Sequence, residues 1–298
     1  MADIQSLFDK LMALQTLEGA STKSALDRLG LFVDLSGDLG REDGNARALA
    51  WADELTKGKL LPRETALLEF FRANLWANRQ AQKHHDANAA WAWEQPELQR
   101  QIFHLRSAAQ HQGFPRLARL RRCQIFTNLG NQLDTLGRFV EAQAIWSRAL
   151  AQDSHFGMAL GNRGYGRFQY AASLYDHGHR DVFLFFAHKD LGAALSRKAK
   201  FEGDGYPEAK ASFSEIKAKI EATINIRRAE RLVVMEGYPT GRSKAERQYR
   251  RWVSHNGLFL NPLNDLSSYS IAAQDVLSRH PLRLLPDSFR RLSASSTR

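Results

Sequence analysis

Apolar residues recur every three or four positions through most of the chain, the spacing that places them on one face of an amphipathic helix. Ser21 or Thr22 is suited to cap the second of these helices, because its hydroxyl can accept a hydrogen bond from a backbone N–H of the first turn. A glycine-rich segment, SGDLGREDG, follows this opening pair. Before residue 116 the pattern predicts helices at 4–17, 21–33, 46–55, 63–84 and 96–111.

The clearest helical pair is expected over residues 127–156, TNLGNQLDTLGRFVEAQAIWSRALAQDSHF. The small residues Gly130 and Ala142 permit two antiparallel helices to approach closely, Gly137 opens the turn, and Trp146 fills the groove that the small residues leave. This spacing resembles one unit of a tetratricopeptide repeat. Because an isolated unit would leave an apolar face in water, the pattern predicts an all-α fold, a tetratricopeptide-like solenoid of helical hairpins with a short C-terminal helical appendage.

A second copy of the unit is expected in ALGNRGYGRFQYAASLYDHG, because Gly164 follows Gly130 by 34 residues (164 − 130 = 34). Arg163 stands where the first copy has Leu129. An 11-residue insertion moves the three small or apolar positions of the second helix to Ala187, Leu191 and Ala194, in place of Ala142, Trp146 and Ala149. The insertion holds aromatic and histidine residues that we expect in the core rather than on a ligand surface: Tyr170, Tyr175, His177, His179, Phe183, Phe185 and Phe186.

The chain is expected to have four regions. Residues 1–115 form an N-terminal helical region with degenerate repeats, and residues 116–200 hold the tetratricopeptide-like repeats. Apolar periodicity predicts one long helix within 201–236. Residues 237–298 change in character and end in a polar tail, so we expect either part of a further domain or a cap on the solenoid with a frayed end.

The chain has a formal net charge of +10, from 42 Lys and Arg against 32 Asp and Glu. Two basic clusters could attract polyanions, although solvated helix faces carry such clusters as well. The first cluster is free of acidic residues, and the second is opposed only by Glu246. They consist of Arg106, Arg116, Arg119, Arg121 and Arg122, and of Arg242, Lys244, Arg247, Arg250 and Arg251.

Cysteine usage and hydropathy narrow the class of protein. Cys123 is the single cysteine, which excludes an intramolecular disulfide and an all-cysteine metal site within one chain. The first residues lack a basic region followed by an apolar core, and no run of about 18 uncharged apolar residues is present. We therefore expect a cytoplasmic protein with no membrane partner.

The segment YRRWVSHNGLFLNPLNDL, residues 249–266, is not explained by helical periodicity alone. Asn261 and Asn264 can cap adjoining turns around Pro262, so a structural loop is one interpretation. Taken in order, TNLGNQLDTLGRFVEAQAIW, FGMALGNRGYGRFQYAASLYDHGH and YRRWVSHNGLFLNPLNDL resemble a bacterial family in which tetratricopeptide-like repeats precede a HEPN-type domain. The resemblance covers roughly residues 121–284, and it implies that residues 237–298 are a partial HEPN-like segment. It also implies an all-α fold and a role in RNA cleavage, RNA-linked defence or stress response.

The resemblance implies a pair of catalytic residues. HEPN-type nucleases use an Arg followed four to six residues later by His, with two protomers pooling such pairs and no metal. The His can move a proton at the ribose 2′-hydroxyl while the Arg stabilises charge on the phosphate. Arg250 and His255 have this spacing and adjoin the family-like segment. The same spacing, or nearly so, recurs in Arg79 with His84, Arg106 with His111, and Arg148 with His155.

The sequence does not indicate a bound metal or cofactor. The paired histidines His84–His85 and His177/His179 could bind a metal, but no third ligand is evident, and we expect no metal and no cofactor. The first hypothesis is therefore a protein-interaction scaffold whose concave groove holds a protein or peptide. Its partner-binding residues are Gln124, Thr127, Asn131, Asp134 and Thr135.

Two alternatives stay open. One is a metal-independent HEPN-type endoribonuclease that acts as a homodimer through Arg250 and His255. The other is RNA binding without cleavage, which should weaken steeply with salt where Lys and Arg contact phosphate.

Overall fold

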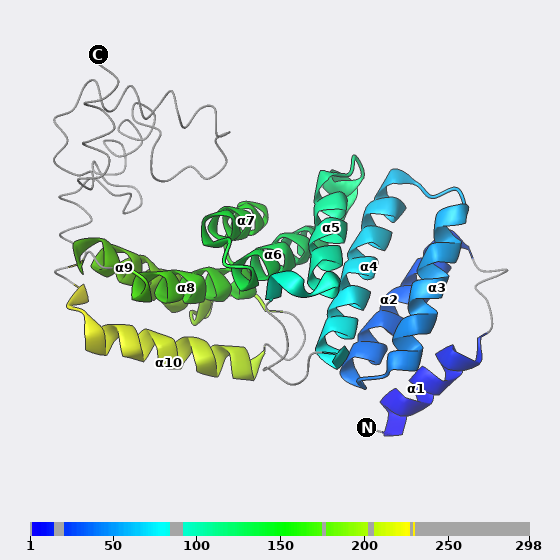
Figure 1. Ribbon diagram of the computed structural model, residues 1–298, viewed down its shortest axis with the longest axis horizontal. Coiled ribbons are helices and arrows are strands. Elements are labelled where there is room, and N and C mark those ends of the chain that lie inside the picture. The colour runs from blue at the N-terminus through cyan, green and yellow to red at the C-terminus, as the bar shows by residue number, and fades with distance from the viewer. Residues whose placement is uncertain are drawn as a thin grey trace, which may run out of the picture. The chain divides into compact units, whose positions relative to one another are not determined.

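The computed structural model describes residues 2–14, 21–83, 92–174, 177–201, 206–226 and 229. Over these ranges it is helical, with ten α-helices and two short 3-10 helices and with one isolated β-bridge as the single strand-like feature (Figure 1). The prediction of an all-α fold is thus confirmed for this part of the chain. The chain divides into two compact units, the first of residues 1–166 with 190–214 and the second of 167–189 with 215–298.

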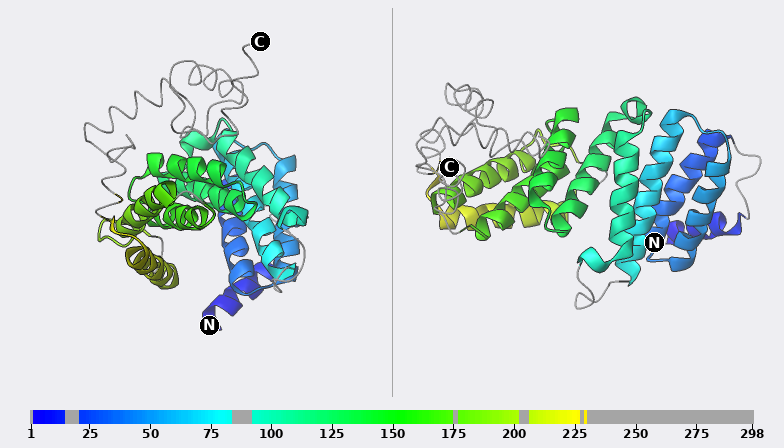
Figure 2. Two further views of the ribbon diagram at one scale, coloured as in Figure 1. Left: turned by 60° about the vertical axis from the view of Figure 1, so that its left-hand side comes forward. Right: turned by 45° about the horizontal axis from the view of Figure 1, so that its top comes forward.

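The described helices follow one another along the chain. They are α1 Ala2–Ala13, α2 Thr22–Asp38, α3 Glu42–Lys57, α4 Pro62–Lys83, η1 Ala92–Glu94, α5 Pro96–Gln110, η2 Phe114–Arg116, α6 Arg119–Thr135, α7 Phe139–Gln152, α8 Gly157–Ala172, α9 His177–Ala194 and α10 Pro207–Thr223. In the first unit α2, α3, α4 and α5 run side by side in both Figure 1 and Figure 2, and the most extensive pairings are α4 with α5 and α6 with α7.

The helix α2 is longer than its pattern predicts. Ser21 caps it as expected, because its Oγ accepts a hydrogen bond from the Ser24 backbone N–H at 3.3 Å. The helix then runs through Gly37 to Asp38, and the chain turns only at Gly40, where φ is +62°. A Cβ atom at Gly37 would lie 2.7 Å from Oδ1 of Asn78 on α4, so this glycine serves helix packing and not a break.

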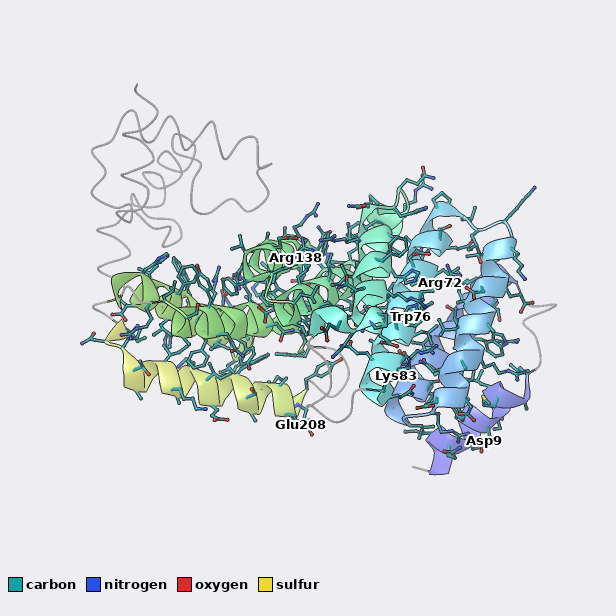
Figure 3. The ribbon with its side chains drawn as sticks, in the orientation of Figure 1. Asp9, Arg72, Trp76, Lys83, Arg138 and Glu208 are labelled. Carbon is teal, nitrogen blue, oxygen red and sulfur yellow. The ribbon has the colours of Figure 1, made fainter. Side chains whose placement is uncertain are left out.

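A polar seam joins α4 to α5 inside an otherwise apolar hairpin. Glu97 is buried and accepts a hydrogen bond from Nζ of Lys83 at 2.8 Å, and His104 Nδ1 lies 2.8 Å from a carboxylate oxygen of Glu69. The guanidinium of Arg100 lies 4.2 Å from the ring centroid of Trp76. Figure 3 labels Trp76 and Lys83 on the same helix, α4. The hairpin is therefore held in register by polar contacts as well as by its core.

The α6–α7 hairpin confirms the packing predicted for it. Trp146 is 1% exposed, and a Cβ atom built on Gly130 would lie 2.5 Å from its Nε1, so the indole occupies the space that the missing side chain leaves. Leu129 and Ala149 are buried as well. Gly137 has a φ of +73° and its N–H donates to the Asp134 carbonyl, so it closes the turn in the left-handed conformation that glycine adopts without strain.

The 11-residue insertion is absorbed mainly as helix. Ala142 is the fourth residue of α7, whereas its counterpart Ala187 is the eleventh residue of α9. Among the aromatic residues expected in the core, Phe185 is buried, while Tyr170 and Phe183 are half-buried and pack edge to face with ring centroids 4.9 Å apart. Tyr175 lies outside the described residues.

The long helix predicted within 201–236 is interrupted in the structure. The helix α10 ends at Thr223, Ile224 and Asn225 are not helical, and Ile226 and Ala229 are helical again. Residues 227 and 228 and the whole region from 230 onward, including the proposed HEPN-like segment, lie outside the described residues.

Candidate functional site

The five predicted partner-binding residues lie on α6 and differ in accessibility. Thr135 is exposed and its hydroxyl donates to the Asn131 carbonyl at 3.0 Å, while Gln124 and Asp134 are half-buried. Thr127 is only 3% exposed, and its hydroxyl makes no hydrogen bond within the described part of the chain. A partner could reach that hydroxyl only after a neighbouring side chain had moved, so Thr127 belongs to the core more than to an open surface.

Asn131 lies where α6, α7 and α8 meet. Its Oδ1 accepts two hydrogen bonds of 2.9 Å, one from Nε1 of Trp146 on α7 and one from Nδ2 of Asn162 on α8. The indole N–H of a buried tryptophan needs an acceptor, and Asn131 supplies it. Sequence reasoning singled out Asn131 but missed Asn162, although Asn162 stands 34 residues after Asn128 and so repeats an asparagine of α6 at the repeat period.

These two bonds determine how both amides are oriented. Because Oδ1 of Asn131 accepts from Trp146 and Asn162, its Nδ2 is left as a donor, and because Asn162 donates through Nδ2, its Oδ1 is left as an acceptor. Neither remaining atom has a hydrogen-bond partner among the described residues, and both side chains are half-buried, so solvent reaches them in part. The two linked side chains therefore offer N–H donation from Asn131 and a carbonyl acceptor on Asn162.

An ion pair holds the helix that carries Asn162. The guanidinium of Arg163 binds the Asp190 carboxylate through two hydrogen bonds of 2.7 and 2.8 Å, and its third nitrogen donates to Ser147 Oγ at 3.0 Å. Burial of Arg163 opposes its charge, yet the attraction and hydrogen bonds of Asp190 outweigh that cost and raise the pKa of the guanidinium. The Arg163 side chain of α8 therefore contacts both α7 and α9 through hydrogen bonds.

Asp134, one turn after Asn131, is in a less polar environment than a surface carboxylate. Burial raises the pKa of its carboxyl above the ordinary value of 3.8. Its backbone carbonyl accepts a hydrogen bond from the Gly137 N–H in the turn, so the residue lies at the end of α6. A positive charge placed beside this carboxyl would lower its pKa again.

The predicted catalytic pair, Arg250 and His255, lies outside the described residues. Of the other Arg/His pairs, Arg106 with His111 and Arg148 with His155 are described, and both members of the first pair have internal partners. Arg106 forms an ion pair with Glu141 at 3.4 Å, and His111 Nδ1 accepts from the Gly113 N–H at 3.1 Å. Within the described ranges no three His, Cys, Asp or Glu side chains are grouped so as to hold a metal ion.

The first basic cluster is only partly available to a polyanion. Arg106 is paired as described, and the guanidinium of Arg121 lies 4.6 Å from the ring centroid of Phe70. Arg116 and Arg119 are exposed. The second basic cluster, from Arg242 to Arg251, lies outside the described residues.

Among the helices that the structure describes, none has the length and apolar character needed to cross a bilayer. The chain matches no family model, no curated protein and no solved structure.

Proposed function

We propose that this protein is a peptide-binding helical-repeat module that captures an extended segment of a protein partner at Asn131 and Asn162. The proposal rests on one observation, the pair of amides whose internal hydrogen bonds leave a donor on Asn131 and an acceptor on Asn162. An extended peptide presents its backbone C=O and N–H groups in alternation, and it can satisfy such a pair without a particular side chain.

Preorganisation makes this pair effective for binding. Free asparagine side chains would lose rotamer freedom when they bind a peptide, but here Trp146 and the Asn131–Asn162 bond already hold both amides in place. The ion pair of Arg163 with Asp190 supports the helix that carries Asn162. Little ordering is then required of the protein when the peptide arrives, so the groove can select a partner by the side chains that flank the bound backbone.

The test is the substitution Asn131→Asp in the full chain. Asp keeps an oxygen that can accept from Trp146 and Asn162, but it replaces the N–H donor with a charged acceptor that repels a peptide carbonyl. Peptides selected from a displayed library of linear sequences against the unchanged chain should bind the variant at least about tenfold more weakly, which corresponds to about 1.4 kcal/mol. Isothermal titration with a synthetic copy of the selected peptide measures this loss.

Asn128→Asp is the matched control, because it makes the same chemical change one turn earlier on the same helix. We expect the control to bind the peptide with nearly unchanged affinity. Equal affinity of the Asn131→Asp variant and the unchanged chain would rule out the amide pair as the binding site. A failure of the library to yield any binder would count against peptide capture altogether.

The ribonuclease interpretation stays a prediction of the sequence. It depends on Arg250 and His255, and no contact among the described residues favours it. Cleavage of labelled RNA in the presence of a chelator, lost on His255→Ala, would support it. Cleavage that survives this substitution would assign the chemistry elsewhere.

A further inference from the structure

A cavity of about 260 Å³ lies in the first unit, away from the amide pair. Its lining comes from the start of α6, the turn between α7 and α8, and the segment after α9. Backbone hydrogen bonds join two of these walls, because Lys200 donates its N–H to the His155 carbonyl and accepts from the Gly157 N–H, both at 2.8 Å. The cavity is therefore framed by main-chain contacts and does not depend on loose side chains alone.

The walls of the cavity are largely apolar. Leu120, Phe156 and Phe201 line it, and the ring of Phe201 packs against Gly157, where an added Cβ would lie 2.4 Å from the ring. Cys123 also lines it as an uncharged group. Burial, with a smaller effect from Asp153, raises the pKa of the Cys123 thiol to about 11, and the thiol faces the Ala149 carbonyl at 3.6 Å. At neutral pH this sulfur is a soft apolar wall and not a nucleophile.

The charged groups at the cavity leave one positive charge in excess. Nζ of Lys200 donates to Asp153 at 3.0 Å, and the same carboxylate accepts from the His155 N–H at 3.0 Å. Partial burial opposes ionisation of Asp153, but these bonds and the charges of Lys200 and Arg119 lower its pKa, so it is ionised at neutral pH. Arg119 is attracted to Asp153 at longer range but makes no hydrogen bond or ion pair with the described residues.

We propose that this cavity binds a small carboxylic acid with an apolar body, the carboxylate at Arg119 and the body between Phe156 and Phe201. A guanidinium presents paired N–H donors that match the two oxygens of a carboxylate. Pockets for drug-sized ligands have volumes of about 300–1,000 Å³, so this cavity suits a molecule with one ring or one short branched chain. The apolar walls favour such a molecule over a fully hydrated anion such as inorganic phosphate.

The experiment uses the full chain and phenylacetate as the probe, with 2-phenylethanol as its uncharged counterpart and inorganic phosphate as an anion without an apolar body. Binding is followed by ligand-observed NMR titration. Phenylacetate should bind saturably, and both comparison compounds should bind at least about tenfold more weakly. The reason is that 2-phenylethanol lacks the carboxylate and inorganic phosphate lacks the apolar body.

Arg119→Gln removes the carboxylate-binding cation and should weaken phenylacetate binding at least about fivefold. Arg116→Gln is the matched control, since Arg116 is also exposed and near the start of α6 but does not line the cavity. Both positions are on the surface, so both variants should fold. Absence of saturable binding, equal binding of 2-phenylethanol, or equal loss in the two variants would each overturn the proposal.

Discussion

In the α6–α7 hairpin, Leu129 is buried against its neighbours, whereas the corresponding position of the α8–α9 hairpin holds Arg163, whose guanidinium binds Asp190. The second-helix residues of the two hairpins are alike in burial. Trp146 and Ala149 of the first are as fully buried as Leu191 and Ala194 of the second. The two hairpins therefore bury the same positions of their second helices. Their first helices differ, because Leu129 of α6 makes an apolar contact and Arg163 of α8 makes an ionic one.

This difference shows that the predicted repeat position of Leu129 tolerates a charged residue. A charged residue is accepted at the position of Leu129 because the facing helix supplies a matching charge, and Asp190 stands where α7 has Ile145 after the insertion is counted (190 − 145 = 45). A buried ion pair is not a strong source of stability, but an unpaired member is costly. The pair can therefore be replaced only as a unit.

The largest expected effect follows from breaking that pair. Arg163→Leu copies Leu129 into the second hairpin but removes the guanidinium and its two hydrogen bonds from Asp190, whose side chain is 8% exposed. We expect the free energy of unfolding to fall by roughly 3–5 kcal/mol. Urea unfolding followed by circular dichroism measures the change.

The double variant Arg163→Leu/Asp190→Ile completes the copy, because Ile is the residue of α7 at the corresponding place. It should recover stability to within about 1–2 kcal/mol of the unchanged chain. If the double variant is as unstable as Arg163→Leu alone, the two hairpins differ in more than this exchange of an ionic for an apolar contact.

A second, smaller effect is expected from Gly130→Ala. Helix propensity alone favours Ala by about 1 kcal/mol, but the added Cβ would lie 2.5 Å from Trp146 Nε1. We therefore expect a net loss of roughly 1–3 kcal/mol in thermal or urea unfolding. Adding Trp146→Leu, the residue of the second hairpin, should make Gly130→Ala less costly than it is beside tryptophan. A stabilising Gly130→Ala would show that the indole is free to move.

The smallest effect concerns Asp134, whose pKa is raised by burial from the ordinary value of 3.8. A carboxyl with a raised pKa in the folded state favours folding below its unfolded pKa, and that benefit is lost as pH rises through the folded pKa. Asp134→Asn should therefore be more stable than the unchanged chain at pH 7, by less than about 1 kcal/mol. The advantage should vanish below about pH 3, which unfolding curves at several pH values can check.

Local patterns predicted the first hairpin well, because Gly130, Gly137 and Trp146 act within one short stretch of chain. The bond from Asn162 to Asn131 could not be predicted in the same way, since it joins residues 31 apart and depends on how α8 packs beside α6. The predicted end of α2 at residue 33 was too early, because Gly37 makes room for Asn78 of another helix and does not end α2.

The cavity was missed for a similar reason. Two of its walls are joined by backbone hydrogen bonds of Lys200 with His155 and Gly157. Backbone hydrogen bonds form whatever the side chain is, so the pattern of apolar residues does not reveal them. The pairing of Arg163 with Asp190 was signalled only as a departure from the apolar pattern, because the sequence does not show which acid would face the arginine.

Binding at the amide pair is tested most directly by following the side-chain signals of Asn131, Asn162 and Trp146 by two-dimensional NMR while the library-selected peptide is added. We expect the Asn131 side-chain NH₂ signals to shift as the NH₂ group binds the peptide, while the indole N–H signal of Trp146 keeps its position because its bond to Asn131 Oδ1 persists. Unchanged Asn131 signals on saturation with peptide, or a large shift of the Trp146 indole signal that shows the amide has turned, would contradict it.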